Sequence, residues 1–285
     1  MKAKVSTASI VLCLATWCSN EHGGAVGFQQ PTSLQGRGVA PTASTTRLGV
    51  GVQHLQEQER PEPTEVSRAI VGALKGGLVS IYGDRHFARF YALETIARVP
   101  YFSYTSCLHL LETLGFVRRA DCLRIHFMET YNELHHLIIM EEFGGNDAFF
   151  DRFLAQHIAF GYYWVAVLLY LVAPSAAYNL NQCVEEHAYD TYDKFLESHG
   201  EELKLQDPTP TALAYYQEDK LYVFNSIHNS DVDFEVLDRS RPRIETLYDV
   251  FKAIRDDEME HVKTMSAMQL EDIYQEKYFG ANNRF

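Results

Sequence analysis

The spacing of glutamate and histidine residues constrains the fold of this 285-residue chain more than its overall composition does. The motif Glu-x-x-His occurs twice, each time in a segment whose pattern predicts a helix, and two further predicted helices each supply one glutamate to the same arrangement. Positions i and i+3 share one face of an α-helix, so each motif can present a carboxylate and an imidazole to the same point. In chain order these residues are Glu94, Glu133, His136, Glu185, Glu258 and His261.

These six residues have the composition of a metal site. A single Glu-x-x-His is common on solvated helices, but two copies with carboxylates from two further helices match the di-iron sites of four-helix bundles. Glu94 and Glu185 lie beside apolar stretches, where a carboxylate is costly to bury unless it is paired or binds metal. Carboxylate and imidazole donors without thiolate suit iron or manganese. We therefore predict an all-α, ferritin-like four-helix bundle that holds two iron ions (Fe2+/Fe3+) per chain.

Composition argues against some other classes of protein. The formal net charge of −13, with no basic patch, disfavours binding to nucleic acid. Hydrophobic residues make up 46% of the chain, which is ample for a buried core. The five cysteines are scattered and show no C-x-x-C spacing, so we expect buried free thiols rather than disulfides or a zinc site.

The N-terminal segment differs from the rest of the chain. An apolar run at 9–17 follows two lysines in the layout of a signal peptide, and the acid-poor stretch behind it is similar to a transit peptide. The join at 24–28, small residues followed by phenylalanine, resembles the bipartite presequences of algae with secondary plastids. A disordered tail without a targeting role is the alternative. We predict a removed presequence at 1–60, a di-iron domain at 61–275 and a tail at 276–285.

Periodicity, glycines and prolines predict where the helices begin and end. Gly83, Gly115 and Gly144 stop three helices, and Asn146 or Asp147 caps the next one. The expected helices cover 64–82, 85–114 with a perturbation at Pro100, 118–142, about 147–198 with a break or kink at Pro174, and 243–275, while 200–240 is expected to be irregular or to form short helices.

The stretch 158–178 carries no charged residue and is long enough to cross a bilayer. A bundle helix is the alternative. Glu185 follows this stretch and must return to meet Glu133 and His136, which a long helix that folds back along 118–142 allows. We therefore expect the stretch to be buried or interfacial rather than membrane-spanning.

Four segments carry a specific resemblance to a known family. The plastid terminal oxidases, the plastid branch of the alternative oxidase family, have segments similar to Leu93–Phe102, Asn132–Glu142 with Gly144-Gly145-Asn146, Cys183–Leu196 and Arg255–His261. The double histidine after Glu133 favours the plastid branch over the mitochondrial branch. The resemblance covers about 78–268, and only the part at 217–240 matches loosely.

This resemblance implies a membrane-bound, non-haem di-iron quinol oxidase that oxidises plastoquinol and reduces O2 to water. It implies monotopic attachment on the stromal side of the thylakoid membrane, with extra helices near 64–92 and 101–115 pressing apolar surface into one leaflet. The six residues named first would be the iron ligands. The other residues carried over by position are Tyr192 as redox relay, Asn132 and Asp257 as groups that orient ligands, and Arg89, Leu93, Ala188 and Thr191 as the lining of the quinol pocket.

Three neighbours of the predicted ligands have less specific roles. His135 and His187 lie one helical step round from the ligand face, so we expect them to surround the site or face solvent. Glu129 shares the face of Glu133 and is expected to be a hydrogen-bond partner or a proton carrier rather than a ligand.

Other functions remain open on the residues alone. A mitochondrial-type ubiquinol oxidase would have the same chemistry in a different membrane. A ferritin-like iron-storage protein would need a cage-forming surface and no quinol pocket, and a hydroxylase or desaturase would need an organic substrate. A homo-oligomer is compatible with the sequence.

Overall fold

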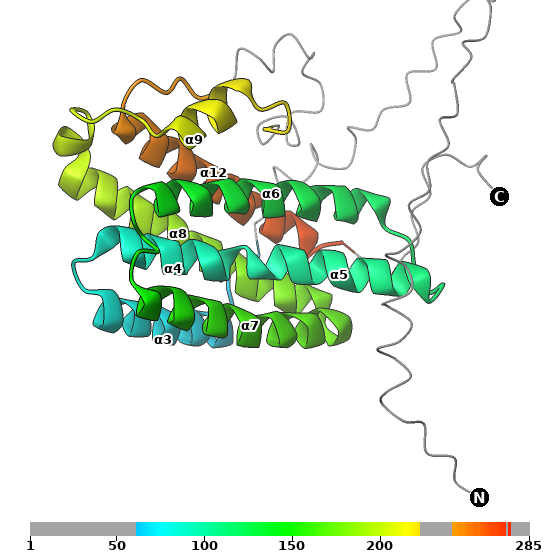
Figure 1. Cartoon of the computed structure of the whole chain (residues 1–285). Coiled ribbons are helices and arrows are strands. Elements are labelled where there is room, and N and C mark those ends of the chain that lie inside the picture. The colour runs from blue at the N-terminus through cyan, green and yellow to red at the C-terminus, as the bar shows by residue number, and fades with distance from the viewer. Residues whose placement is uncertain (1–60, 223–240, 272, 275–285) are drawn as a thin grey trace, which may run out of the picture. The chain divides into compact units, whose positions relative to one another are not determined.

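The computed structural model describes residues 61–222, 241–271 and 273–274. Within these residues all regular secondary structure is helical and no strand is present (Figure 1). This confirms the predicted all-α fold. The predicted presequence and tail, and most of the loosely matching segment before the last helix, lie outside the described residues.

The helices pack in a layered bundle. They are α3 (Glu65–Tyr82), α4 (His86–Ala97), α5 (Val99–Thr113), α6 (Ala120–Glu142), α7 (Phe149–Val172), α8 (Pro174–Leu203), α9 (Pro210–Leu213), the π-helical turn η2 (Ala214–Glu218) and α12 (Leu247–Met268). α4 and α5 follow one another nearly end to end and pack between α6 and α7 (Figure 1). α8 packs along α12 more extensively than any other described pair, and α3 lies against α8 and α4.

Local sequence signals set several helix ends as predicted. α3 begins after Thr64, whose hydroxyl accepts a hydrogen bond from the Ser67 amide at 3.2 Å. It ends at Gly83, where φ is +52°, a conformation that glycine adopts readily. The chain breaks at Arg98 between α4 and α5, so Pro100 occupies the first turn of α5, where it displaces no helical hydrogen bond. The predicted end at Gly83 and the perturbation around Pro100 are therefore confirmed.

The predicted cap of the α7 helix is wrong. Neither Asn146 nor Asp147 caps it, because α7 begins after Ala148, which provides no side-chain hydrogen bond. The Asp147 amide instead donates to the Gly144 carbonyl at 3.1 Å and closes the turn after α6. The chain therefore reaches helical geometry only beyond the predicted capping residues.

Three further boundaries differ from the prediction: the end of α8 and both ends of α12. α8 continues past 198 to Leu203. α12 begins at Leu247 rather than at 243, because Thr246 and Asp249 form a capping box that fixes its first turn, and it ends at Met268. The predicted break at Pro174 is confirmed, since Ala173 separates α7 from α8.

The segment at 64–92, expected to contribute extra helices at the membrane surface, lies in two environments. α3 covers the outside of the bundle, whereas α4 belongs to the core, and every side chain from Phe90 to Ala97 is buried. The three described cysteines, Cys107, Cys122 and Cys183, are buried and form no disulfide among the described residues, as predicted.

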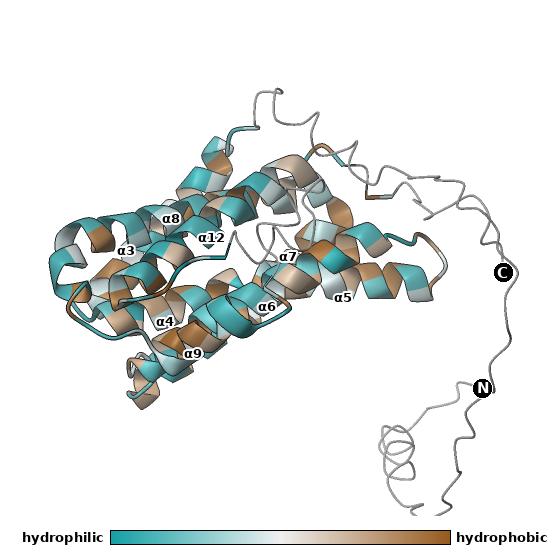
Figure 2. Ribbon diagram, turned by 90° about the horizontal axis from the view of Figure 1, so that it is seen from above, coloured by the Kyte–Doolittle hydropathy of each residue, from teal (hydrophilic) through white to brown (hydrophobic). Residues whose placement is uncertain are grey.

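The apolar stretch of α7 is largely exposed. By length and composition α7 could cross a membrane, yet only 17% of its most apolar 18-residue window is buried. Of the two expected alternatives, burial is therefore excluded for most of α7, which lies at the edge of the bundle, and the interfacial placement stays a prediction. α3 and α5 expose apolar side chains too, and Figure 2 shows hydrophobic colour along α5 and α7. The large exposed apolar residues of the three helices are Val66, Ile70, Val79, Ile81, Phe102, Leu110, Phe149, Phe150, Phe153, Phe160, Trp164, Val165, Leu168 and Val172.

Candidate metal centre

Four helices bring the six predicted ligands together inside the bundle. α4 supplies Glu94 and α8 supplies Glu185, while α6 and α12 each supply the glutamate and histidine of one Glu-x-x-His motif. All six side chains are inaccessible to solvent. Carboxylates are rarely buried without a partner or a metal, so the burial of four of them at one place indicates a metal-binding or functional site.

The six residues form two overlapping groups. Glu94 and His136 belong to one group and Glu185 and His261 to the other, while Glu133 and Glu258 belong to both. Within each group the candidate ligand atoms lie within 4.8 Å of one another. Two shared carboxylates between two otherwise separate ligand sets are the arrangement expected for a pair of adjacent metal ions.

Each imidazole turns its Nδ1 atom toward the carboxylates. His136 Nδ1 lies 3.2 Å from Glu258 Oε1 and 3.6 Å from Glu94 Oε2. His261 Nδ1 lies 2.9 Å from Glu133 Oε1 and 3.3 Å from Glu258 Oε2. The nitrogen and oxygen atoms therefore converge on a common interior volume.

Unsatisfied acceptors show that this volume fits a cation. Among the described residues, both carboxylate oxygens of Glu133 and one oxygen each of Glu94, Glu185 and Glu258 make no hydrogen bond of acceptable geometry, and neither does His136 Nδ1. Buried polar atoms without partners are costly, so such a concentration at one point needs an explanation. Oxygen and nitrogen ligands without sulfur suit divalent iron or manganese.

Burial and mutual repulsion perturb the titration of the metal-free cluster. Burial raises the pKa of Glu133 well above its usual value, and the nearby Glu258 and Glu94 raise it further. Burial also raises the pKa of Glu185 to about 8, although contact with His261 opposes the shift. Burial opposes ionisation of Glu258 as well, but contacts with His136 and His261 outweigh it and lower its pKa to about 2. The metal-free site therefore retains protons that a metal must displace.

One flank of the cluster, here called the tyrosine flank, is closed by hydrogen bonds to Asp257. His136 Nε2 lies 3.2 Å from Asp257 Oδ2, and Asn132 Nδ2 donates to the same oxygen at 2.9 Å. The Tyr216 hydroxyl donates to that oxygen, and the Tyr222 hydroxyl donates to Oδ1, each at 3.0 Å. A carboxylate on the far nitrogen of a metal-binding histidine fixes its ring orientation and tautomer, which is the position predicted for Asp257.

A second flank, here called the cavity flank, has fewer partners. The buried Tyr192 hydroxyl donates to Glu94 Oε1, and the Tyr192 ring stacks on Phe90 with centroids 4.5 Å apart. At the adjacent corner the Tyr101 hydroxyl donates to Glu185 Oε1 at 2.8 Å. Burial, together with the carboxylate that each contacts, raises the pKa of both tyrosines well above its usual value, so both hydroxyls keep their protons.

Glu129 lies outside both ligand groups and has its own partner. Its Oε2 atom lies 3.1 Å from His126 Nδ1, and His126 Nε2 lies 2.9 Å from the Tyr178 hydroxyl. The Tyr178 hydroxyl in turn lies 2.9 Å from that of Tyr170. This buried chain joins α6, α8 and α7, and it places Glu129 as a hydrogen-bond partner.

A cavity of about 170 Å³ is lined by residues of α3, α4 and α8, among them three of the four predicted pocket residues: Arg89, Leu93 and Thr191. The fourth, Ala188, is buried and does not line it. His187 lines it too, and burial lowers the pKa of His187 to about 4. We call this space the Arg89 cavity.

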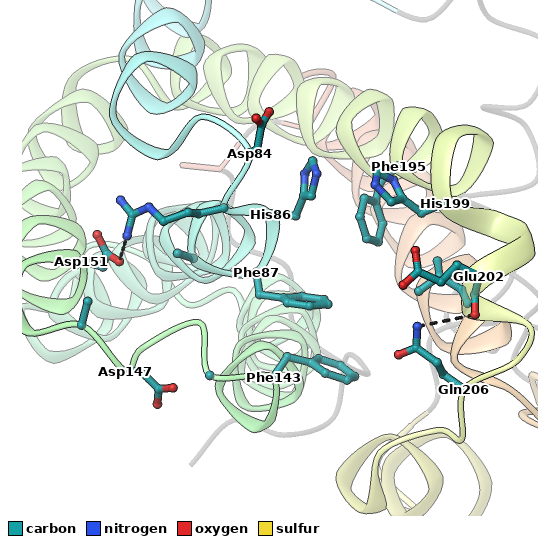
Figure 3. Close-up of a pocket in the computed structure, with 15 residues that line it drawn as sticks. Asp84, His86, Phe87, Phe143, Asp147, Asp151, Phe195, His199, Glu202 and Gln206 are labelled. Atoms are coloured by element: carbon teal, nitrogen blue, oxygen red, sulfur yellow. Dashed lines mark hydrogen bonds and ion pairs between the residues drawn. The ribbon is translucent and has the colours of Figure 1, made fainter.

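A second, larger cavity of about 480 Å³ adjoins the Arg89 cavity, since His86 and Phe195 line both (Figure 3). Its lining includes four carboxylates and His199. We call it the acidic cavity.

Sequence reasoning missed several residues that contact the centre. Tyr101 lies on α5, beyond the break at Arg98, so helical spacing from Glu94 does not place it beside the ligands. Tyr215, Tyr216 and Tyr222 follow α8 in a segment without regular periodicity. The adjacent pair Tyr215-Tyr216 is the one feature of this segment that could have indicated a role. His135, expected near the site, stacks on Tyr215 with centroids 4.0 Å apart.

Comparison with known proteins supports the resemblance. The family model described as alternative oxidase matches residues 54–269. A protein of Arabidopsis thaliana named ubiquinol oxidase 4, chloroplastic/chromoplastic, is 55% identical over 192 residues. This match covers 67% of the present chain and 54% of that protein. Because the family model spans most of the chain, this protein belongs to the alternative oxidase family.

Proposed function

We propose that this protein is a plastoquinol:oxygen oxidoreductase that couples oxidation of a quinol to reduction of O2 to water. The observation that carries the proposal is the pair of ligand groups sharing Glu133 and Glu258 in a member of the alternative oxidase family. Two iron ions bound there would supply the redox chemistry, taking electrons from the quinol and passing them to O2. Two quinols are consumed for each O2 that becomes two waters.

The protein's own part begins with holding the ligands. Glu94 with His136, and Glu185 with His261, would each complete one metal position around the two shared carboxylates. Asp257 and Asn132 act through His136, because Asp257 fixes the imidazole and Asn132 donates to Asp257.

The Arg89 cavity is the place we propose for the quinol. Its volume of about 170 Å³ is large enough for the aromatic ring of a quinol, because a cavity of about 150 Å³ binds benzene. Leu78 and Leu93 offer apolar contact, and Arg89 and Thr191 offer polar groups for the quinol hydroxyls. The isoprenoid tail would leave the cavity past Val79, an exposed apolar residue of α3.

Tyr192 links the cavity to the centre. It follows Thr191, which lines the cavity, and its hydroxyl donates to the predicted ligand Glu94. An electron from a quinol in the cavity would pass Tyr192 before it reaches the ligands. We therefore propose Tyr192 as the redox relay.

Membrane attachment is proposed to be monotopic. α3, α5 and α7 expose large apolar side chains, which an aqueous surface disfavours and the interior of one leaflet accepts. The Arg89 cavity opens beside α3, so a quinol dissolved in lipid could enter laterally. Quenching of Trp164 fluorescence by lipids brominated at different depths would test this placement. Strong shallow quenching is expected, whereas no quenching by any lipid would contradict it.

The proposed location is the plastid, on the stromal side of the thylakoid membrane. The name of the Arabidopsis relative places that protein in chloroplasts and chromoplasts, and the N-terminal sequence is similar to bipartite presequences. Import of residues 1–60 fused to a fluorescent protein tests the location. Mitochondrial import would favour the ubiquinol-oxidase alternative.

The experiment that tests the activity is oxygen uptake by iron-loaded protein in lipid vesicles, driven by a plastoquinol analogue in the presence of cyanide. Glu133→Ala provides the matched control. Cyanide-insensitive uptake that is lost in the control is the expected result. Absence of uptake in protein that holds two irons per chain would overturn the proposal in favour of iron storage or of another oxidised substrate.

A further inference from the structure

Two residues form the wall between the Arg89 cavity and the acidic cavity. His86 and Phe195 line both spaces, and Figure 3 shows them beside His199 at one side of the acidic cavity. His86 is half-buried at the start of α4, and its ring centroid lies 5.3 Å from that of Phe195 and 4.8 Å from that of His199. An imidazole at this wall can exchange protons with both sides.

The two cavities carry opposite charge. The Arg89 cavity is lined by Lys75, Arg89 and Lys194, and no carboxylate lines it. The carboxylates that line the acidic cavity are Asp84, Asp147, Asp151 and Glu202, of which Asp151 is paired with Arg85 at 2.5 Å. Electrostatic repulsion by these cations and attraction by these carboxylates both favour movement of a proton from the Arg89 cavity to the acidic cavity.

His86 is prepared to receive a proton. Burial lowers its pKa, and so do the neighbouring Arg89 and His199, while Asp84 opposes the shift. The ring is therefore neutral at neutral pH. Arg89 Nη2 lies 3.4 Å from His86 Nδ1, so the residue that we place against the quinol also contacts the ring.

Quinol oxidation needs such a route, because each quinol releases two protons as it gives up two electrons. We infer that His86 takes a hydroxyl proton of the bound quinol and passes it by way of His199 to the acidic cavity, which serves as the proton outlet. The quinol O–H bond breaks, an N–H bond forms on His86, and the two electrons leave the quinol past Tyr192 toward the two iron ions that the six ligands would hold. The second hydroxyl proton follows the same route once His86 has passed the first to His199. The inference rests on the proposed function, since it needs a quinol in the Arg89 cavity.

The test uses full-length, iron-loaded protein in vesicles with a plastoquinol analogue. His86→Ala removes the base and opens the wall, so added imidazole can occupy the gap. We expect turnover to fall about 10²-fold, as for loss of a general base, with little change in KM. Imidazole should restore much of it, and the restoration should grow with pH as the neutral form of imidazole increases.

Two controls separate the base from the wall. Phe195→Ala also opens the wall but removes no base, so imidazole should not stimulate it. His157→Gln removes an exposed histidine of α7 that lines neither cavity and should behave as wild type. Iron content and thermal midpoint establish that each variant is folded.

The outcomes distinguish this inference from the proposed function. If wild type oxidises quinol but His86→Ala turns over normally, or only its KM rises, or imidazole rescues Phe195→Ala equally, the proton outlet is wrong and the oxidase stands. If wild type shows no quinol-dependent oxygen uptake, the proposed function itself fails.

Discussion

The two flanks of the ligand cluster are built differently. On the tyrosine flank, Asp257 accepts hydrogen bonds from one amide, one imidazole and two phenols, and every partner is buried. On the cavity flank, Glu94 has one phenol partner, Tyr192, and a cavity lies just beyond. The tyrosine flank is thus suited to fixing the orientation of His136, and the cavity flank is suited to admitting a substrate.

This difference separates two roles for buried tyrosines. Tyr216 and Tyr222 donate to the two oxygens of the same carboxylate, that of Asp257, so each is partly redundant with the other in orienting it. Among the described residues, Tyr192 is the one phenol that donates to Glu94, and its neighbour Thr191 lines the cavity. Loss of a hydroxyl should therefore be mild on the tyrosine flank and severe on the cavity flank.

The largest loss of iron and activity is expected from substitution of Glu133, which belongs to both ligand groups. Glu133→Ala removes a carboxylate from both ligand groups, so both metal positions should empty and oxidase activity should disappear. Iron per chain measured by elemental analysis, alongside oxygen uptake, checks this. Glu197→Ala, on the exposed surface of α8, is the matched control and should keep both. Full iron content in Glu133→Ala would refute the shared-ligand assignment.

Loss of the phenol on the cavity flank should stop turnover without emptying the site. Tyr192→Phe keeps the ring stacked on Phe90 but removes the hydroxyl that donates to Glu94. We expect iron content near wild type and turnover lower by about 10²-fold or more, the scale for loss of a positioned catalytic group. Tyr189→Phe, a half-buried neighbour on α8, is the control. Normal turnover in Tyr192→Phe would end the relay proposal.

These contrasts show what the sequence could and could not foretell. The six candidate ligands were visible because helical spacing forces Glu133 with His136, and Glu258 with His261, onto single faces. The partners of Asp257 were not visible, because Tyr216 and Tyr222 come from an irregular segment whose position depends on tertiary packing. Composition likewise could not show that α7 lies at the edge of the bundle, since buried and lipid-facing helices have similar sequences.

On the tyrosine flank, the charge of Asp257 should matter more than its shape. Asp257→Asn keeps the volume but weakens the acceptor for His136 Nε2 and for the two phenols. Loss of such a partner typically costs 10–100-fold in metal affinity or activity. Competition with a chelator measures the affinity. Asp256→Asn, at an exposed neighbour that pairs with Lys252 and Arg255, should change it little. An equal loss in both variants would contradict the assignment.

The cluster as a whole should bind metal more weakly as the pH falls. Burial raises the pKa of Glu133 and of Glu185, the latter to about 8, so the metal-free site holds protons at neutral pH. Metal must displace these protons, so affinity should drop about tenfold per pH unit for each proton released. The Glu185 contribution should vanish above pH 8, where its carboxylate is already ionised. Titration of Fe2+ or Mn2+ at several pH values checks the slope, and a flat profile would contradict it.

The smallest effect is expected from a single phenol on the tyrosine flank. Tyr222→Phe removes the donor to Asp257 Oδ1 but leaves the amide and the other phenol on Oδ2. One hydrogen bond is worth about 1 kcal/mol net, so metal affinity should fall only about fivefold. Tyr163→Phe on α7 supplies the control, read in the same chelator competition. If Tyr222→Phe reduced turnover as much as Tyr192→Phe while iron stayed bound, the assignment of different roles to the two flanks would be wrong. Electron transfer through the tyrosine flank would then have to be included.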